Sequence, residues 1–336
     1  MTAAAERTVP RLDPRHYEPA RVPYEVRRHA GTPDTLAVGR PGKVGLLEPA
    51  FEKVAGRTEL TGHYQKSPLQ ITRPLYFDPA RPDLAVTFLM STGGGILQAD
   101  RLRTDLHCGA DTAVHLTTQA ATKVYRMEHD YATQLVDLTA GPRAYVEYLP
   151  EPVIPFGDSR LYQRTVLTVD PDATALAGET VLAGRLARGE RDAYRVFASD
   201  LEVRRPDGGL VALDTVRPEP APTGGGGVTG PAVPAGYDVM SSLYVLSPLA
   251  PAGRIADVLH EAVAGSGQGR DEQLYAFDLA TSGLRWQAES ESPGRDTGAD
   301  HPIRLAAVGG TVYRSSRAGV LALGALPPLP PLPPSA

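Results

Sequence analysis

The feature that most constrains the fold is a series of short segments with the residue pattern of β-strands, placed at near-regular spacing through the chain. The segment 84–92 is a continuous apolar run, which is typical of a strand buried on both faces. In 102–108, every second side chain is charged or a histidine, which is the pattern of a half-buried strand. Further strands are predicted over 112–119, 131–139, 144–149, 162–169, 194–204, 210–216, 239–246 and 273–279. The sequence therefore predicts a mostly-β fold.

Helix signals are few. Glycine (34 residues) and proline (32 residues) together make up about a fifth of the 336 residues, which argues against a helical bundle. The segment 254–264 places apolar side chains on one face and predicts a helix that ends before Gly265. A weaker helix is predicted over 173–187, where alanine and leucine favour a helix but two glycines oppose it. Between two strand segments, 206–209 (Pro-Asp-Gly-Gly) predicts a hairpin turn.

Composition divides the chain into one domain with loose ends. Residues 1–23 carry prolines and mixed charges with little apolar periodicity, and they predict a flexible N-terminal arm. A single β-rich domain is predicted over 24–325, with a Gly/Pro-rich insertion at 217–236. The end of the chain, 326–336, is a proline-rich tail of the kind that is usually solvated.

Charge and cysteine content exclude several classes of protein. The net charge of −5 and the pI near 5.9 disfavour nucleic-acid binding. The sequence shows neither the apolar run needed to span a bilayer nor the apolar core of a signal peptide, so we expect a cytoplasmic protein that does not contact membranes. Cys108 is the one cysteine, which excludes an internal disulfide and a Cys-rich zinc site.

A glycine-rich segment follows the apolar strand at 84–92. Its three consecutive glycines, Gly93, Gly94 and Gly95, could turn backbone amides toward an anion, but the Gly-Lys-Ser/Thr ending of a phosphate-binding loop is missing. We therefore favour a tight turn that lets the backbone approach a neighbour closely. Asp100 follows the turn, and two interpretations remain: a surface carboxylate paired with a nearby arginine, which we favour, or an oxygen ligand for a metal ion.

The eight histidines include no HExxH motif. His107 and His115 could face each other across adjacent strands, close to Cys108, as a nitrogen and sulfur site for nickel or zinc. Ordinary polar strand positions are the favoured interpretation, and no neighbouring base supports Cys108 as a nucleophile. If Asp100, His107 and His115 gather around one pocket, the chain is instead a β-rich enzyme of unknown substrate. A carbohydrate- or protein-binding module is a third candidate, but only 6% of the residues are aromatic.

The segment 116–126 (LTTQAATKVYR) concentrates hydroxyls, an amide and two cations between strands. It predicts a polar strand-to-loop crossing, a docking surface or the wall of a hydrogen-bonding conduit, and composition does not choose among them. Its candidate residues are Thr117, Thr118, Gln119, Lys123, Tyr125 and Arg126. Glu190, in the segment 187–191 (ARGER), is either part of a solvated turn or an oxygen ligand.

Several motifs in one order resemble the UreD/UreH family of urease accessory proteins. They are HYQKSPLQITRPLYF (63–77), STGGGILQADRL (91–102), LTTQAATKVYR (116–126) and EYLPEPVIPF (147–156), with RTVLTVDPDATAL (164–176), ARGER (187–191) and YDVMSSLYVL (237–246). The resemblance covers about residues 60–246. Two departures accompany it: the family usually has glycine at the position of Ala99, and the C-terminal third lacks a clear family pattern.

The resemblance implies a layered, helix-like stack of many short strands with about two helices. It also implies a non-enzymatic scaffold for nickel insertion that binds apo-urease and a second accessory protein, which recruits a nickel-carrying GTPase. No cofactor would be bound permanently, because nickel would pass through an internal water-filled route. Asp100 and Glu190 match acidic family positions on that route, while the glycine turn and the candidate residues of 116–126 match the conduit or a partner surface. A carboxylate route suits transit, because oxygen ligands exchange a metal more easily than a Cys/His cage.

Overall fold

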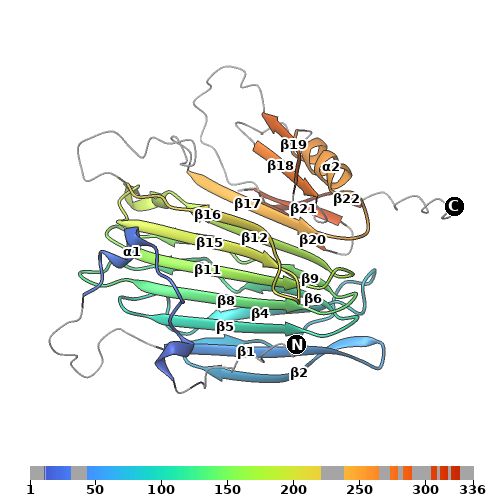
Figure 1. The fold of residues 1–336 in the computed structure, drawn as a ribbon, viewed down its shortest axis with the longest axis horizontal. Helices are drawn as coiled ribbons and strands as arrows, with labels where there is room; N and C mark the ends of the chain where they lie inside the picture. Colours follow the sequence, from blue (N-terminus) through green and yellow to red (C-terminus); the bar gives the residue numbers. More distant parts are fainter. Residues whose placement is uncertain are drawn as a thin grey trace.

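A computed structural model describes residues 11, 13–31, 44–220 and 238–264, together with the backbone of five strands between 273 and 325. Two large sheets lie face to face and contain most of these residues (Figure 1). Sheet A has the strand order β16-β15-β11-β8-β5-β1-β2. Sheet B has the order β3-β4-β6-β9-β12-β10-β7, with β17 paired to β12.

The bounds of the elements are as follows. Sheet A consists of β1 (Val44–Val54), β2 (Arg57–Lys66), β5 (Arg101–Cys108), β8 (Ala132–Ala140), β11 (Arg160–Val169), β15 (Val196–Arg204) and β16 (Leu210–Val216). Sheet B consists of β3 (Leu69–Ile71), β4 (Ala85–Ser91), β6 (Ala113–Thr118), β7 (Thr122–Val124), β9 (Tyr145–Tyr148), β10 (Val153–Pro155), β12 (Thr174–Leu182) and β17 (Val239–Leu246). Smaller pairings join β13 (Gly184–Arg185) to β14 (Glu190–Arg191), β18 (Gln273–Asp278) to β19 (Gly283–Glu289), and β20 (Arg304–Val308), β21 (Thr311–Ser316) and β22 (Gly319–Ala325) to one another. The helices are η1 (Pro14–His16), α1 (Tyr24–Arg27), η2 (Leu186–Arg188) and α2 (Ala252–Ala264).

The chain winds as a coil, because successive strands alternate between the two sheets. β5, β8, β11 and β15 are parallel in sheet A, and β4, β6, β9 and β12 are parallel in sheet B. The short strands β7 and β10 pair in parallel and form a third side of the coil. The prediction of a mostly-β, helix-like stack of short strands with about two helices is confirmed.

The core lies between the sheets and follows the alternation along each strand. In β5 every second residue is buried, and the buried residues face the interior. The apolar interior divides into two clusters: one contains Leu106, Leu138 and Leu167, and the other contains Leu161 and Phe197. Burial of these side chains is the main source of stability, at roughly 25 cal/mol for each Å² of apolar surface removed from water.

One predicted helix is wrong. Most of the segment 173–187 forms β12 (174–182) rather than a helix, and Ala175, Ala177 and Val181 are buried at inward positions of this strand. β12 pairs with β9 on one side and with β17 on the other, so backbone hydrogen bonding across the sheet overrides the helix preference of alanine. The helix expected over 254–264 is present as α2, and Gly208 has a φ of 87° in the hairpin turn between β15 and β16.

The part of the N-terminal segment that the structure describes lies on the outer face of sheet A. It runs across the starts of the strands, from η1 near β1 to α1 near β15 (Figure 1). Tyr17 and Val26 are buried there, and Val26 packs with Tyr131 and Tyr162. The sequence predicted a flexible arm over 1–23, whereas residues 13–31 pack on the sheet. The predicted tail 326–336, and the insertion 217–236 apart from its first four residues, lie outside the described residues.

Candidate functional site

The family motifs meet on the third side of the coil. The Ile96 amide donates to the Lys123 carbonyl (2.8 Å), and the Tyr125 amide donates to the Ile96 carbonyl (2.9 Å). The segment 153–156, in the next turn of the coil, extends this hydrogen-bonded row. Val124 pairs with Pro155, and its carbonyl accepts a hydrogen bond from the Phe156 amide (2.9 Å). Three segments that are distant in the sequence therefore form one stacked edge: the glycine turn, 122–125 and 153–156.

The glycine turn is closely packed against this edge. A Cβ atom at Gly95 would lie 2.6 Å from the Lys123 carbonyl oxygen and 2.6 Å from the Tyr125 ring. Gly94 has a φ of 73°, in the left-handed region that favours glycine. The prediction of a turn that allows a close backbone approach is confirmed, and the neighbour that it approaches is the second family motif.

Asp100 closes the glycine turn from inside. Its side chain is 1% exposed, and its Oδ2 accepts a hydrogen bond from the Leu97 amide (2.9 Å). The favoured interpretation as a surface carboxylate is therefore wrong. Ala99 precedes it with a φ of 62°, which explains in physical terms why glycine suits this position.

Glu190 lies at the end of the same edge. It forms an ion pair with Arg185, whose Nε lies 3.1 Å from its Oε2, and it accepts a hydrogen bond from the Gly157 amide (3.1 Å). These two donors lower the pKa of Glu190. Arg185 also stacks on the Phe156 ring at 4.4 Å. The ion pair and the hydrogen bond of Glu190 therefore hold the segment 187–191 (ARGER) against the stacked edge, and the side chain of Glu190 is only partly exposed.

The segment 116–126 closes one corner of the coil and presents charge outward. The Thr118 hydroxyl accepts a hydrogen bond from the Glu151 amide (2.9 Å) and donates to the Ala120 carbonyl (3.1 Å). The Tyr125 ring contacts Phe156 edge to face at 5.2 Å. Thr117 is partly buried, and the exposed side chains of the segment include Gln119, Lys123 and Arg126. The Thr118 hydroxyl therefore stabilises the corner, whereas Lys123 and Arg126 are exposed, with Arg126 Nε 3.6 Å from Asp158 Oδ2.

The alternative of a metal site formed by His107, His115 and Cys108 is not supported, because the three side chains do not come together. β5 belongs to sheet A and β6 to sheet B, so the corner between them separates the two histidines. His107 is exposed, with its Nε2 3.7 Å from Glu52, whereas His115 Nδ1 contacts the fully buried Glu147 at 2.6 Å. Cys108 is buried, which raises the pKa of its thiol to about 12 and leaves it unsuited to nucleophilic chemistry.

A row of polar side chains crosses the interior. Gln134, Gln163 and Ser199 are partners in register on β8, β11 and β15. They share the inward-facing side of sheet A with Leu161 and Leu167, and they separate the two apolar clusters. Glu179, from sheet B, completes this interior polar row. The row was not predicted from the sequence, although Gln163 is a long polar residue at an inward position between Leu161 and Leu167, which is a detectable signal.

Glu179 is the ionisable member of the row. Its Oε1 accepts hydrogen bonds from Ser199 Oγ (2.6 Å) and Gln163 Nε2 (2.7 Å). Burial raises the pKa of Glu179 to about 7; the nearby carboxylates of Asp214 and Asp200 add to this effect, and the Ser199 hydrogen bond opposes it. Gln134 Oε1 is buried without a hydrogen-bond partner in the part of the chain that the structure describes. The row thus combines a carboxylate that titrates near neutral pH with an unused carbonyl oxygen.

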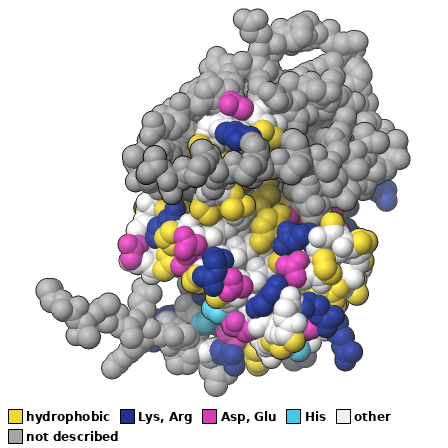
Figure 2. All heavy atoms as spheres, turned by 90° about the vertical axis from the view of Figure 1, so that its right-hand side faces the viewer, with side chains coloured by type: hydrophobic (Ala, Val, Ile, Leu, Met, Phe, Trp, Pro, Cys, Tyr) yellow, Lys and Arg dark blue, Asp and Glu magenta, His cyan; other side chains and the backbone are white. Residues whose placement is uncertain are grey.

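One side of the coil, where the parallel strands of sheet A end, carries mixed charge. The β1–β2 hairpin and the turn after β5 lie on this side, and Figure 2 shows acidic and basic side chains there intermixed with apolar ones. Ion pairs on this side include Arg143 with Asp111 (2.6 Å) and Lys53 with Asp83 (3.4 Å).

Among the described helices, none is both long enough and apolar enough to cross a membrane.

Comparison with known proteins assigns the family. The family model for UreD urease accessory proteins matches residues 43–296. A UreD 2 protein of Streptomyces griseus is 53% identical over 277 residues, which cover 82% of this chain and 93% of that protein. UreD proteins of Cenarchaeum symbiosum and Methylorubrum extorquens are each 36% identical, over 63% and 69% of this chain and 74% and 75% of those proteins. The resemblance found in the motifs thus extends over most of the chain, which belongs to the UreD family of urease accessory proteins.

Proposed function

We propose that this chain is a non-enzymatic scaffold for nickel insertion into apo-urease, and that the ion passes through its interior. It would act with a second accessory protein that recruits a nickel-carrying GTPase. Membership of the UreD family supports the urease role. The observation that carries the route is the interior polar row, because amide, hydroxyl and carboxylate groups cross the interior between two apolar clusters.

The chemistry of the row suits an ion in transit. Amide, hydroxyl and carboxylate oxygens bind a divalent ion more weakly than a closed set of thiolates and imidazoles. The pKa of Glu179 near 7 lets its carboxyl group exchange a proton for a cation at cellular pH. We propose Glu179 as a transient ligand and Gln134, through its unpartnered Oε1, as a second.

Asp100 and Glu190 enter the proposal through the family motifs. Both carboxylates have protein partners: the Leu97 amide for Asp100, and Arg185 with the Gly157 amide for Glu190. Either would have to exchange a partner for the ion. The alternative of an enzyme pocket around Asp100, His107 and His115 gains no support, because the two histidines lie on different sheets.

The test is urease maturation in cells that co-express apo-urease and its accessory proteins. Glu179→Gln keeps the shape of the side chain and removes its charge, so we expect nickel per urease and urea hydrolysis to fall several-fold while the chain still co-purifies with urease. Glu202→Gln is the matched control, because Glu202 lies on the outer face of sheet A beside Arg164 (3.0 Å).

Three outcomes would count against the proposal. Unchanged nickel loading with Glu179→Gln would contradict the interior polar row as the route. Normal activation by both Asp100→Ala and Glu190→Ala would remove these two residues from it. Nickel loading that is the same with and without the whole chain would contradict the scaffold role itself.

A further inference from the structure

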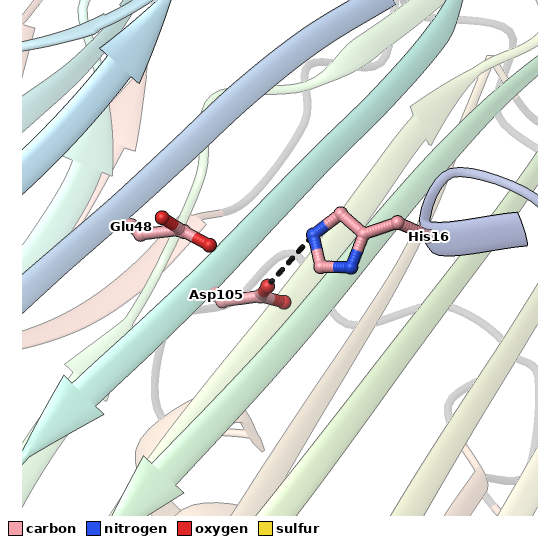
Figure 3. A group of neighbouring side chains, drawn as sticks. All are labelled: His16, Glu48 and Asp105. Atoms are coloured by element: carbon pink, nitrogen blue, oxygen red, sulfur yellow. Dashed lines mark ion pairs between the residues drawn. The ribbon is translucent and has the colours of Figure 1, made fainter. Parts of the chain in front are cut away.

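Three metal-ligating side chains meet where the N-terminal segment crosses sheet A. His16 comes from η1, Glu48 from β1 and Asp105 from β5, a neighbour of β1 in the sheet. Figure 3 shows the imidazole of His16 extending from η1 toward Glu48 and Asp105, with both carboxylates turned toward it. They lie outside the stacked edge and outside the interior polar row, because Glu48 and Asp105 belong to the outer face of sheet A, under the segment that contains His16.

The donor atoms are close enough to reach a single ion after a modest movement. One nitrogen or oxygen atom from each residue lies within 4.8 Å of the others, and His16 Nε2 lies 3.8 Å from Asp105 Oδ2. A tetrahedral ion with bonds of about 2.0–2.2 Å places its ligands about 3.3–3.6 Å apart. The three side chains therefore have to close by at most about 1.5 Å to bind one ion.

The histidine points an unused nitrogen atom into this group. His16 is 6% exposed, and its Nε2 is buried without a hydrogen-bond partner in the described part of the chain. A buried polar atom without a partner is unfavourable, so an ion at this point would satisfy a group that the protein leaves open. This is an observation independent of the two carboxylates, and it indicates a ligand.

Two arginines lie beside the three side chains and affect how tightly these would bind an ion. Arg103 Nε donates to both oxygens of Asp105 (2.9 Å each), and its Nη1 donates to the His16 carbonyl (3.1 Å). Arg103 therefore fixes the geometry, and a carboxylate with about four acceptor positions retains capacity for an ion. Arg11 Nη2 lies 2.5 Å from Glu48 Oε2, where it would compete with an ion for this ligand.

We propose that His16, Glu48 and Asp105 form a binding site for a divalent first-row transition-metal ion, which pins the N-terminal segment to sheet A. One imidazole and two carboxylates suit ions such as Zn²⁺ or Ni²⁺, whereas Mg²⁺ prefers oxygen ligands alone. The ion joins η1 to two strands of the sheet, so it stabilises a contact that otherwise depends on Arg103 and on nearby apolar packing.

Binding to the full chain can be measured with Zn²⁺, Ni²⁺ and Mg²⁺ by titration calorimetry. We expect His16→Ala to weaken one Zn²⁺ site at least tenfold, and Zn²⁺ to slow tryptic cleavage after Arg15 in the unmodified chain but not in this variant. His107→Ala is the matched control, because His107 has a carboxylate neighbour, Glu52, but lies outside the group. Equal Zn²⁺ affinity of both histidine variants would overturn the proposal.

A second variant keeps the test decisive even if His16→Ala disturbs the packing of the N-terminal segment. Arg11→Ala keeps all three ligands and removes the competitor, so we expect Zn²⁺ to bind several-fold more tightly. Unchanged or weaker binding would contradict the site even if His16→Ala also loosens the segment. Urease activation is not a readout of either variant, so a failure of the nickel-insertion proposal leaves this test intact.

Discussion

The surroundings of Glu179 raise the pKa of its carboxyl group. Its carboxyl group lies between two apolar clusters, yet it accepts hydrogen bonds from Ser199 and Gln163. Burial disfavours the charged form, and the carboxylates of Asp214 and Asp200 add repulsion, so its pKa rises to about 7. The folded protein therefore holds a proton on Glu179 at pH values where the unfolded chain has lost it.

This predicts a dependence of stability on pH. A carboxyl group whose pKa is raised by folding stabilises the folded state below its unfolded pKa of 4.5, and this stabilisation is lost as the pH rises to about 7. The loss amounts to about 3 kcal/mol. Urea unfolding measures the free energy of unfolding at pH 5 and at pH 8. We expect this free energy to decrease less between the two pH values for Glu179→Gln than for the unmodified chain. Equal decreases would show that another group causes the pH dependence, such as Asp137, whose pKa is also raised by burial.

At the scale of the element, the glycine turn and β7 depend on each other. Gly95 allows the backbone to approach Lys123 and Tyr125, and the buried carboxylate of Asp100 holds the turn closed. Ala99 is the weak point of this arrangement, because its φ of 62° brings its Cβ close to the following carbonyl oxygen.

We therefore predict that Ala99→Gly stabilises the protein by about 1 kcal/mol. Removal of the Cβ relieves the left-handed conformation, which outweighs the extra backbone entropy of the unfolded chain. Ala120→Gly is the control: Ala120 is exposed in the neighbouring motif and does not have a positive φ, so this change should be neutral or destabilising. The midpoint of urea unfolding measures both variants, and a lower midpoint for Ala99→Gly would contradict the interpretation of strain.

The strands were predictable from the sequence, but their assignment to sheets was not. Alternation in β5 and the continuous apolar run in β4 are local patterns, and both strands are present with bounds close to those expected. The separation of His107 from His115 depends on a corner that sends the chain to the opposite sheet, and local patterns do not record this. For the same reason, the inward direction of Gln163 became meaningful only beside Ser199 and Glu179.

The candidate site was predictable in part. The glycine turn and 116–126 were recognised as motifs, yet their mutual contact required the coil, which brings Ile96 beside Val124. The burial of Asp100 could not be inferred, because nearby arginines suggested a surface ion pair. His16 gave no signal at all, since its ligating neighbours, Glu48 and Asp105, are more than 30 residues away in the sequence.

At the scale of the whole molecule, the N-terminal segment covers one end of the strands of sheet A. Val26 is fully buried and packs with Tyr131, Tyr162 and Val196, which belong to different coils. Arg28 adds an ion pair with Glu219 (2.8 Å), beyond the end of β16. The segment therefore holds several coils together along the direction of the stack.

We predict that Val26→Ala destabilises the chain by roughly 1–3 kcal/mol, because it removes two buried methyl groups and leaves a cavity. Val54→Ala is the matched control: Val54 is 46% exposed at the β1–β2 hairpin, so we expect a change within about 0.5 kcal/mol. Thermal unfolding of the purified chain compares the two variants. Equal melting temperatures would mean that the segment does not hold the coils together in solution.

The ends of sheet A have a consequence for assembly. Its inner strands are all parallel, and a parallel stack could in principle be extended by the first strand of another copy in the same register. β2 and β16 run against that direction at the two edges, and most side chains of β2 are exposed or partly exposed. A further copy could not continue the parallel register past either edge strand. The reversed strands therefore end the parallel coil at both edges of sheet A, so its length is set within one chain.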